Sequence, residues 1–297
     1  MRAVFVGCVE FSRKTLEWLA VQGPGMGLEI AGVVTRAASP FNADFADLGG
    51  VCREHGIPVR LTDDINAVED RQWIADRDPD VLFVFGWSSL IGPELLAVPM
   101  IGAVGYHPAA LPKNRGRHPI IWALALGLEE TASTFFFLDE GADSGDILSQ
   151  KPVPITYGDD AGSLYSLLTR TALSQLAEFV PALVDGSYAR TPQDHSLANT
   201  WRKRGRADGA IDFRMSSRSV YNLVRALARP YVGAHLDCGG DEARVWRVHE
   251  VEVDAPNVEP GKVLAVDGRR FTVKCGEGAV EVVEHELETI PRVGEYV

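Results

Sequence analysis

The fold is decided by the stretch Pro79-Asp80-Val81-Leu82-Phe83-Val84-Phe85-Gly86. Its apolar run is uninterrupted, which is typical of a parallel strand that is buried on both faces of its sheet. Upstream, apolar strands alternate with helical patterns, the strands at residues 1–7, 29–35 and 57–59 and the helices at 11–21, 44–55 and 66–76. This alternation predicts an open, mostly parallel, doubly wound α/β sheet, in which ligands bind beyond the carboxyl ends of the strands.

The same alternation continues downstream of residue 86. A short helix at 93–97 precedes an apolar strand at 101–104, and a helix at 119–127 precedes a strand at 132–138. Residues 147–155 form an extended segment with two prolines, which predicts a strand at the edge of the sheet. A long amphipathic helix at 161–185 follows, and Gly186 is expected to end it.

From residue 206 the pattern changes to one helix and several short strands. The helix is expected at 216–228 and the strands at 234–236, 243–253, 261–266, 271–274 and 280–287. Short strands separated by turns predict a small antiparallel barrel or sandwich. We therefore expect a large α/β domain over residues 1–205 and a smaller domain, a helix followed by barrel-like strands, over residues 206–297.

The composition restricts the partners and the compartment. The chain has 297 residues, a formal net charge of −12 at pH 7 and 46% hydrophobic residues. Bulk nucleic-acid binding is disfavoured, because it normally needs a basic face. No apolar run approaches the ~20 residues of a membrane-crossing helix. The N-terminus lacks the pattern of a signal peptide, so we expect a soluble, cytoplasmic protein. The four cysteines, at 8, 52, 238 and 275, predict neither disulfides nor a metal site.

Two polar loops contain the candidate catalytic residues. His107 ends an apolar strand and precedes a basic loop that opens a helix, so an imidazole, cations and free backbone N–H groups are expected in one cleft. Further along the chain, the polar turn at 139–146 can bring Asp143 to the same cleft. We interpret His107 and Asp143 as a catalytic pair. The alternative is structural, with His107 capping a strand and Asp143 forming an Asx-turn.

The segment 201–206 concentrates four cations in an acidic chain. It reads Trp201-Arg202-Lys203-Arg204-Gly205-Arg206. A positive feature of this size suggests a small phosphorylated ligand, and the alternative is a solvated linker face.

Three runs resemble the signature of 10-formyltetrahydrofolate-dependent formyltransferases. They are His107-Pro108-Ala109-Ala110-Leu111-Pro112-Lys113-Asn114-Arg115-Gly116, Pro119-Ile120-Ile121-Trp122-Ala123-Leu124 and Asp143-Ser144-Gly145-Asp146-Ile147. The family includes methionyl-tRNA formyltransferase, glycinamide ribonucleotide formyltransferase and sugar N-formyltransferases, and the chain is most similar to the sugar branch. The resemblance implies that residues 1–205 are a catalytic domain that binds 10-formyltetrahydrofolate, and that the tail is the smaller domain of the tRNA and sugar branches.

One residue departs from the family pattern. The catalytic trio of the family is Asn, His and Asp, and Gly105 stands at the Asn position, two residues before His107. In the family this amide is taken to donate a hydrogen bond to the formyl oxygen, and losing such a donor typically costs ~10²-fold or more in rate. A backbone N–H, a water, Asn114 or His118 is expected to replace it, and the alternative is a weak enzyme.

The resemblance also implies residues for the two ligands. The cofactor-binding residues would be Phe85, Gly86, Trp87, Ser88, Leu90, Leu138, Glu140 and Asp143, with a core role as the alternative for Trp87. The residues for the acceptor substrate would be Lys113, Asn114, Arg115, Trp201, Arg202, Lys203, Tyr221 and Arg225.

Four interpretations of the function remain open, and the first three differ in the acceptor. The first is the amine of a nucleotide-linked amino sugar, of the 4-amino-4,6-dideoxy type, N-formylated for a surface polysaccharide. The second, methionyl-tRNA, is disfavoured by the charge of −12. The third is an amino acid in secondary metabolism. The fourth is a non-catalytic folate or nucleotide-sugar binding protein. The apolar positions of the tail fit either a homodimer or a small core of its own.

Overall fold

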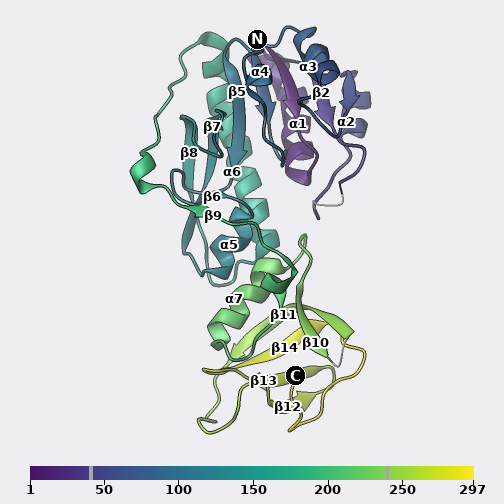
Figure 1. Ribbon diagram of the computed structural model, residues 1–297, viewed down its shortest axis with the longest axis vertical. Helices are drawn as coiled ribbons and strands as arrows, with labels where there is room; N and C mark the ends of the chain where they lie inside the picture. The colour runs from purple at the N-terminus through teal and green to yellow at the C-terminus, as the bar shows by residue number, and fades with distance from the viewer. Residues whose placement is uncertain (40–42, 239–240) are drawn as a thin grey trace. The chain divides into compact units, whose positions relative to one another are not determined.

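The structure, a computed structural model, describes residues 1–39, 43–238 and 241–297 (Figure 1). The backbone divides into two compact units. Unit 1 consists of Met1–Gly116, Thr131–Val153 and Ser166–Trp201, and unit 2 consists of Arg117–Glu130, Pro154–Tyr165 and Arg202–Val297. Unit 2 therefore includes two segments from within the predicted large domain. The predicted boundary at 205/206 stays a prediction.

Unit 1 is built on a seven-stranded sheet with the strand order β3-β2-β1-β4-β5-β7-β8. The strands are β1 (Arg2–Val6), β2 (Glu29–Thr35), β3 (Val59–Leu61), β4 (Val81–Val84), β5 (Gly102–His107), β7 (Glu130–Phe137) and β8 (Ile147–Pro154). The pairs from β3 to β5 are parallel, and β5 pairs antiparallel with β7. The predicted mostly parallel α/β sheet is confirmed, and so is the position of β8 at an edge.

The helices that lie between these strands or follow them in the chain belong to both units. They are α1 (Glu10–Gln22), α2 (Gly49–His55), α3 (Val68–Ala75), α4 (Pro93–Leu96), α5 (Pro119–Ala125) and α6 (Ala161–Asp185), with the 3₁₀ turns η1 (Gly23–Met26), η2 (His195–Leu197) and η3 (Arg206–Gly209). The helix predicted at 44–55 begins only at Gly49. The reason is that Asp44 and Ala46 form backbone hydrogen bonds with Glu10 and Cys8 instead, 2.9 and 3.0 Å long.

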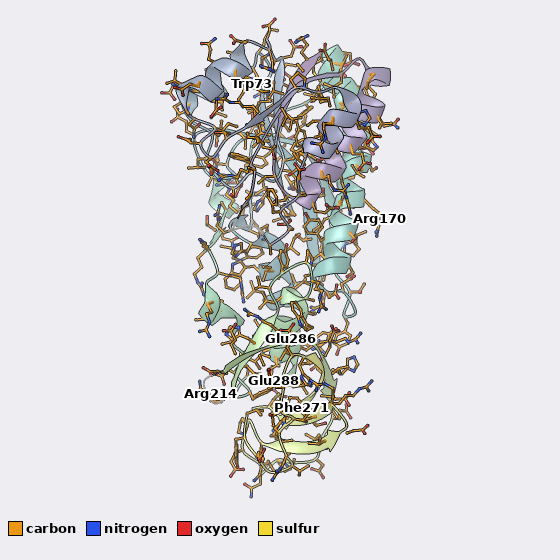
Figure 2. All side chains as sticks on the ribbon, turned by 90° about the vertical axis from the view of Figure 1, so that its right-hand side faces the viewer. Trp73, Arg170, Arg214, Phe271, Glu286 and Glu288 are labelled. Atoms are coloured by element: carbon orange, nitrogen blue, oxygen red, sulfur yellow. The ribbon has the colours of Figure 1, made fainter. Side chains whose placement is uncertain are left out.

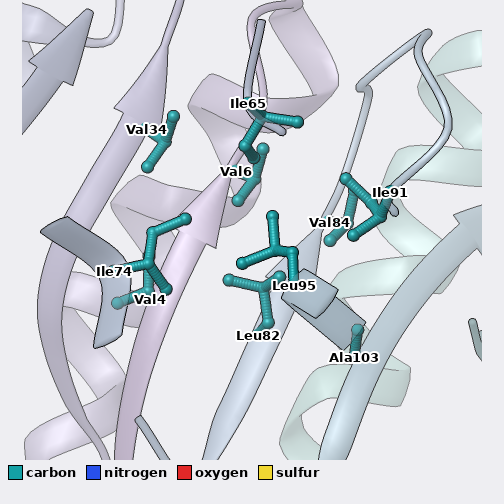
Figure 3. Close-up of a cluster of buried hydrophobic side chains, with 10 residues drawn as sticks. All are labelled: Val4, Val6, Val34, Ile65, Ile74, Leu82, Val84, Ile91, Leu95 and Ala103. Carbon is teal, nitrogen blue, oxygen red and sulfur yellow. The ribbon is translucent and has the colours of Figure 1, made fainter. Parts of the chain in front are cut away.

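The central strand β4 is buried on both faces, as its sequence predicts. On one face, Leu82 and Val84 belong to an aliphatic cluster that also receives Ile74 from α3 and Leu95 from α4 (Figure 3). On the other face lie the rings of Phe83 and Phe85, with Phe5 and Phe135 each within 5.6 Å of the Phe85 ring. Phe11 of α1 and Phe179 of α6 cover this aromatic face. Helices therefore pack on both faces, as a doubly wound sheet requires.

Unit 2 contains one long helix and a five-stranded antiparallel sheet. The helix is α7 (Ser217–Leu227), and the strands are β10 (Ala234–Cys238), β11 (Asp241–Val251), β12 (Val263–Asp267), β13 (Arg270–Lys274) and β14 (Ala279–His285), in the order β10-β11-β14-β13-β12. All pairs are antiparallel. Phe271 is buried among these strands, 5.4 Å from the ring of His285 (Figure 2). Within the described residues no pairing joins β10 to β12, so the strands form a sheet and the predicted barrel is not closed.

Two further properties bear on the sequence predictions. Over residues 1–39, 43–238 and 241–297, none of the helices combines the length and the apolar character needed to cross a bilayer. In the same residues no three His, Cys, Asp or Glu side chains gather as a metal site would require. Cys8, Cys52 and Cys275 are buried and form no disulfide, and the side chain of Cys238 lies outside the described part.

Candidate active site

The end of β5 positions His107. The strand pairs with β4 on one side and β7 on the other, where His107 lies opposite Thr134. Because side chains alternate along a strand, Gly105 and His107 face the same side of the sheet. Tyr106 points to the other side, where its ring stacks 4.1 Å from that of Phe11. His107 is therefore placed at the carboxyl end of a central strand, as predicted, and it is only 5% exposed.

The two ring nitrogens of His107 have different partners. Nε2 lies 2.7 Å from the main-chain oxygen of Asn114. A carbonyl oxygen only accepts, so Nε2 carries the proton and donates it there. Nδ1 of the neutral ring then has a free lone pair, and it lies 3.7 Å from Oδ2 of Asp143. This distance is too long for a hydrogen bond, but it places a carboxylate beside the nitrogen that can accept a proton.

Asp143 lies in the turn between β7 and β8. Its Oδ2 accepts a hydrogen bond from the N–H of Gly116, 2.8 Å away. Its φ is +56°, in the left-handed region that L-residues rarely adopt. The Asx-turn in this segment is formed by Asp139, whose Oδ1 accepts from the N–H of Gly141 at 3.0 Å. The Asx-turn that the sequence allowed for Asp143 is therefore formed by Asp139.

The loop after His107 is held by a short parallel pairing. Strand β6 (Arg115–Gly116) pairs with β9 (Thr200–Trp201). Gly116 has φ +100°, and a Cβ at this position would lie 2.3 Å from the Trp201 carbonyl oxygen. Glycine is thus required where the backbone turns to offer its N–H to Asp143. The backbone N–H of Asn114 donates to Oδ1 of Asn199 at 2.9 Å.

Arg115 is buried, and its guanidinium contacts other side chains of the protein. Its guanidinium donates to Oε1 of Gln193 from Nε and Nη2, at 3.2 and 2.6 Å, and Nη2 lies 3.1 Å from Nδ1 of His195. The sequence interpretation assigned Arg115 to the substrate, which stays a prediction. It did not single out Gln193, because a lone glutamine far along the chain carries no local signal.

Leu138 occupies the space in front of Gly105. A Cβ built on Gly105 would lie 2.5 Å from Cδ2 of Leu138 and 3.3 Å from Cε1 of Phe136. The N–H of Leu138 donates to the Ala103 carbonyl at 2.8 Å, and its side chain packs against the aliphatic cluster. The departure from the family pattern is therefore accompanied by a side chain that fills the place of the missing amide.

The segment predicted for the cofactor follows β4. Phe85 is fully buried, and its carbonyl accepts from the Ser12 hydroxyl at 2.5 Å. Gly86 has φ +75°. The indole Nε1 of Trp87 is buried, and no acceptor for it exists among the described residues. Ser88, Leu90 and Glu140 are exposed, as is Lys113 of the loop after β5.

Four of the predicted substrate residues belong to unit 2, and three of them have partners there. Arg202 pairs with Asp208, 2.8 Å from Nη1 to Oδ2, and holds the pKa of that carboxyl well below its usual range. The Tyr221 hydroxyl donates to the Tyr157 carbonyl at 2.7 Å. Arg225 donates to three main-chain carbonyls, those of Thr156, Tyr157 and Asp159. Lys203 is exposed.

A cationic environment surrounds His118 in unit 2. The guanidinium of Arg204 lies 4.5 Å from the centre of the Trp122 ring, and its backbone N–H donates to Nδ1 of His118 at 3.3 Å. Burial, together with the charges of Arg117, Arg204 and Lys203, lowers the pKa of His118. The sequence left His118 as a structural residue or as a substitute for the missing Asn.

Several solved structures share this fold. WlaRD, a sugar 3N-formyl transferase crystallised with dTDP and 5-N-formyl-THF, is 16% identical with a TM-score of 0.70, over 97% of this chain and 98% of that one. The N-formyltransferase from Helicobacter canadensis, with folinic acid and dTDP-3-aminofucose, is 14% identical with a TM-score of 0.70, over 95% and 98%. HypX from Aquifex aeolicus, with tetrahydrofolic acid, is 17% identical with a TM-score of 0.65, over 96% of this chain but only 44% of HypX.

The sequence itself matches two family models. Residues 26–180 match the model described as formyl transferase, and residues 204–293 match the model described as formyl transferase, C-terminal domain. The first match alone spans more than half of the chain. Its residues contain the strand end with His107 and the turn with Asp143. The chain therefore belongs to the formyl transferase family.

Proposed function

We propose that this protein transfers a formyl group from 10-formyltetrahydrofolate to the primary amine of a nucleotide-linked amino sugar. The observation that carries the proposal is the pair formed by His107 and Asp143, in which the unprotonated Nδ1 faces a carboxylate 3.7 Å away. Family membership makes formyl transfer the reaction that such a proton acceptor serves. The sugar would be of the 4-amino-4,6-dideoxy type, and its N-formylated product would enter a surface polysaccharide.

His107 would remove the proton that the amine loses when it forms the amide. Nδ1 is the only ring nitrogen with a free lone pair, because Nε2 donates to the Asn114 carbonyl. Once Nδ1 is protonated, the Asp143 carboxylate stabilises the imidazolium charge. The N–H of Gly116 keeps this carboxylate in place at 2.8 Å. The pair thus accepts a proton without any movement of the buried ring.

The residues after β4 fit a bound folate. The buried indole N–H of Trp87 lacks an acceptor among the described residues, and a ligand atom would supply one. Phe85, Gly86, Trp87, Ser88, Leu90, Leu138 and Glu140 would hold the cofactor, mainly through their main-chain groups. When bound, the folate supplies the activated formyl carbon.

Asn114 is our candidate for the missing oxyanion donor. Its carbonyl contacts His107, which places the residue beside the proton acceptor. In the described part of the chain its side-chain amide has no hydrogen-bond partner, so the amide is free to bind a substrate oxygen. His118 already uses Nδ1 to accept from Arg204. We therefore favour Asn114 over His118 for the role that the family gives to an Asn at position 105.

The proposed acceptor rests on charge and on similar structures. WlaRD was crystallised with dTDP, and the Helicobacter canadensis enzyme with dTDP-3-aminofucose. Which residues contact the nucleotide sugar stays a prediction from the family resemblance, and the exposed Lys113 of the loop after β5 is the first of them to test. We also propose a cytoplasmic location and a homodimer, and size-exclusion chromatography with light scattering would test the dimer.

The function is tested by incubating the protein with 10-formyltetrahydrofolate and a panel of amines. The panel contains nucleotide-linked amino sugars, methionyl-tRNA and free amino acids, and mass spectrometry detects the mass of an added formyl group. We expect formylation of a sugar, and orders-of-magnitude losses of kcat in His107→Ala and Asp143→Ala with folate binding retained. Formylation of tRNA or an amino acid alone would replace the proposed acceptor. Folate binding without turnover would indicate a non-catalytic binding protein.

A further inference from the structure

Gln193 is a buried side chain that links two parts of the candidate active site. It is 6% exposed and lies between the Asp143 turn and Arg115. Its amide nitrogen donates to the carbonyls of Asp143 and Gly145, at 2.9 and 2.6 Å. Its amide oxygen accepts two hydrogen bonds from the Arg115 guanidinium. Both ends of the side chain are therefore engaged by main chain or charge within the site.

We propose that Gln193 is a positioning residue that holds the Asp143 carboxylate opposite Nδ1 of His107. Gln193 does not touch His107, so it acts only through Asp143. Its effect on turnover rests on the proposed formyl transfer, whereas its effect on the position of Asp143 does not.

The backbone of Asp143 needs such support. With φ at +56°, this residue is in a conformation that persists only where its surroundings determine it. Two hydrogen bonds do so, one from Gly116 to the side chain and one from Gln193 to the main-chain oxygen. Without the second, the turn could relax and Oδ2 would leave its place beside the imidazole.

An amide side chain satisfies both neighbours at once. Arg115 offers donors, so its partner must accept, while the carbonyls of Asp143 and Gly145 accept, so their partner must donate. Glutamine does both from one side chain, whereas an ionised glutamate only accepts. The chemistry at position 193 is thus matched to the two groups that it joins.

The fold brings Gln193 to this place through a short bridge. Ile147, at the start of β8, exchanges two backbone hydrogen bonds with Thr191, 2.8 and 2.9 Å long. The chain from Thr191 to Gln193 therefore runs antiparallel to β8, toward the turn that precedes β8. Asp194 then caps the 3₁₀ turn η2 by accepting from the N–H of Ser196 at 3.0 Å. The bridge at Thr191 and the cap at Asp194, one on each side of residue 193, fix the direction in which the Gln193 side chain points.

The first experiment measures the position of Asp143 without using activity. Hydrogen exchange of the Gly116 amide, which donates to Asp143, is followed by NMR in wild type and Gln193→Glu. Glutamate keeps the bond to Arg115 but cannot donate, so we expect Gly116 to exchange roughly tenfold faster or more. Gln193→Met, which removes both bonds, should give at least the same acceleration and serves if Gln193→Glu fails to fold.

Gln175→Glu is the matched control. Gln175 is also fully buried, and its amide donates to the Ser133 carbonyl and the Ser149 hydroxyl, at 3.1 and 2.9 Å. It has no bond to the Asp143 turn. We expect Gly116 in Gln175→Glu to exchange at the wild-type rate, and so more slowly than in Gln193→Glu, when the variants are compared at matched global stability. Equal acceleration in both variants would show general loosening and overturn the proposal.

The second experiment asks whether Gln193 acts through Asp143. Gln193→Glu should lower kcat by roughly 10-fold to 100-fold with KM little changed. In the Asp143→Asn background the same change should lower kcat no further, whereas an independent structural defect would multiply the two losses. Unchanged Gly116 exchange in both Gln193 variants would refute the positioning role. Faster exchange in a protein whose wild type transfers no formyl group would refute only the proposed function.

Discussion

At the scale of single residues, three residues that the sequence singled out have unusual backbone conformations. Asn114, His118 and Asp143 have positive φ, and Asp78 is the only other non-glycine residue with positive φ in the described part. Asn and Asp tolerate this region better than other L-residues, so their types agree with it. The sequence placed Asn114 and Asp143 in loops correctly. It did not predict their φ, because contacts from Asn199, Gly116 and Gln193, distant in sequence, determine these conformations.

The space beside Gly105, where the family has an Asn side chain, is a second feature that the sequence predicted only in part. The sequence identified Gly105 as the departure, but not that Leu138 fills the space. Residue 138 was assigned to the cofactor from the family resemblance alone. Contact between neighbouring strands is a tertiary property, and no local pattern encodes it.

Gly105→Asn is expected to lower the free energy of unfolding by roughly 1–3 kcal/mol, because its side chain would overlap Leu138. In a Leu138→Ala background the same change should cost less, and kcat should rise at least about tenfold over Leu138→Ala alone. Denaturant unfolding and steady-state kinetics of the four proteins measure both effects. Independent, additive costs would contradict the overlap.

Asn114→Gly is expected to lower kcat by about 10²-fold, because it removes the proposed oxyanion donor. Glycine adopts φ +64° without strain, so the backbone of the loop and the unfolding midpoint should be retained. The matched control is Asp78→Gly, which replaces a positive-φ residue before the start of β4, outside the loops of the candidate active site. Equal kcat in wild type and Asn114→Gly would exclude the amide from the reaction.

At the scale of elements, the strongest predictions came from long, periodic segments. Helix α6 has the predicted bounds, and β2 does too. The pairing of β6 with β9 escaped prediction, because strands of two residues carry no periodic signal. The early start predicted for α2 was wrong, since residues 44–46 bond to residues 8–10 and cannot enter a helix.

Gly116→Ala tests the pairing of β6 with β9. The new Cβ would meet the Trp201 carbonyl oxygen at 2.3 Å, and a backbone atom cannot move aside as a side chain would. We expect a loss of more than about 1 kcal/mol in the free energy of unfolding, with lower kcat because the Gly116 N–H supports Asp143. Gly186→Ala, at φ +78° in open space, carries the backbone strain alone. Similar effects of both changes would show that the pairing is dispensable.

At the scale of the whole molecule, the predicted combination of an α/β sheet with a smaller antiparallel part is confirmed. What the sequence could not provide is the division into compact units. Helix α5 and residues 154–165 cluster with α7 and the antiparallel sheet, although they are encoded within the predicted large domain. Long-range packing decides this division. A single boundary placed in the sequence cannot describe units that each consist of several separate segments.

The ion pair between Arg202 and Asp208 predicts a pH dependence of stability. The folded pKa of Asp208 lies below its ordinary value of 3.8, so the pair stabilises the folded state above pH 3.8. This contribution is lost as the pH falls further, toward the folded pKa. Asp208→Asn should therefore lower the melting temperature at pH 6 and have a shrinking effect below pH 3.8. A difference that stays constant across a melting series from pH 2 to pH 7 would contradict this account.

The two edges of the seven-stranded sheet affect how the chain behaves at high concentration. One edge, β3, is only three residues long, and the other, β8, includes Pro152 and Pro154. Proline has no N–H, and a three-residue strand offers few partners, so neither edge is a good template for a strand from another molecule. The apolar strands between them are thereby shielded from intermolecular β-pairing. This geometry favours a chain that resists aggregation, and any self-association would use side-chain surfaces instead of sheet extension.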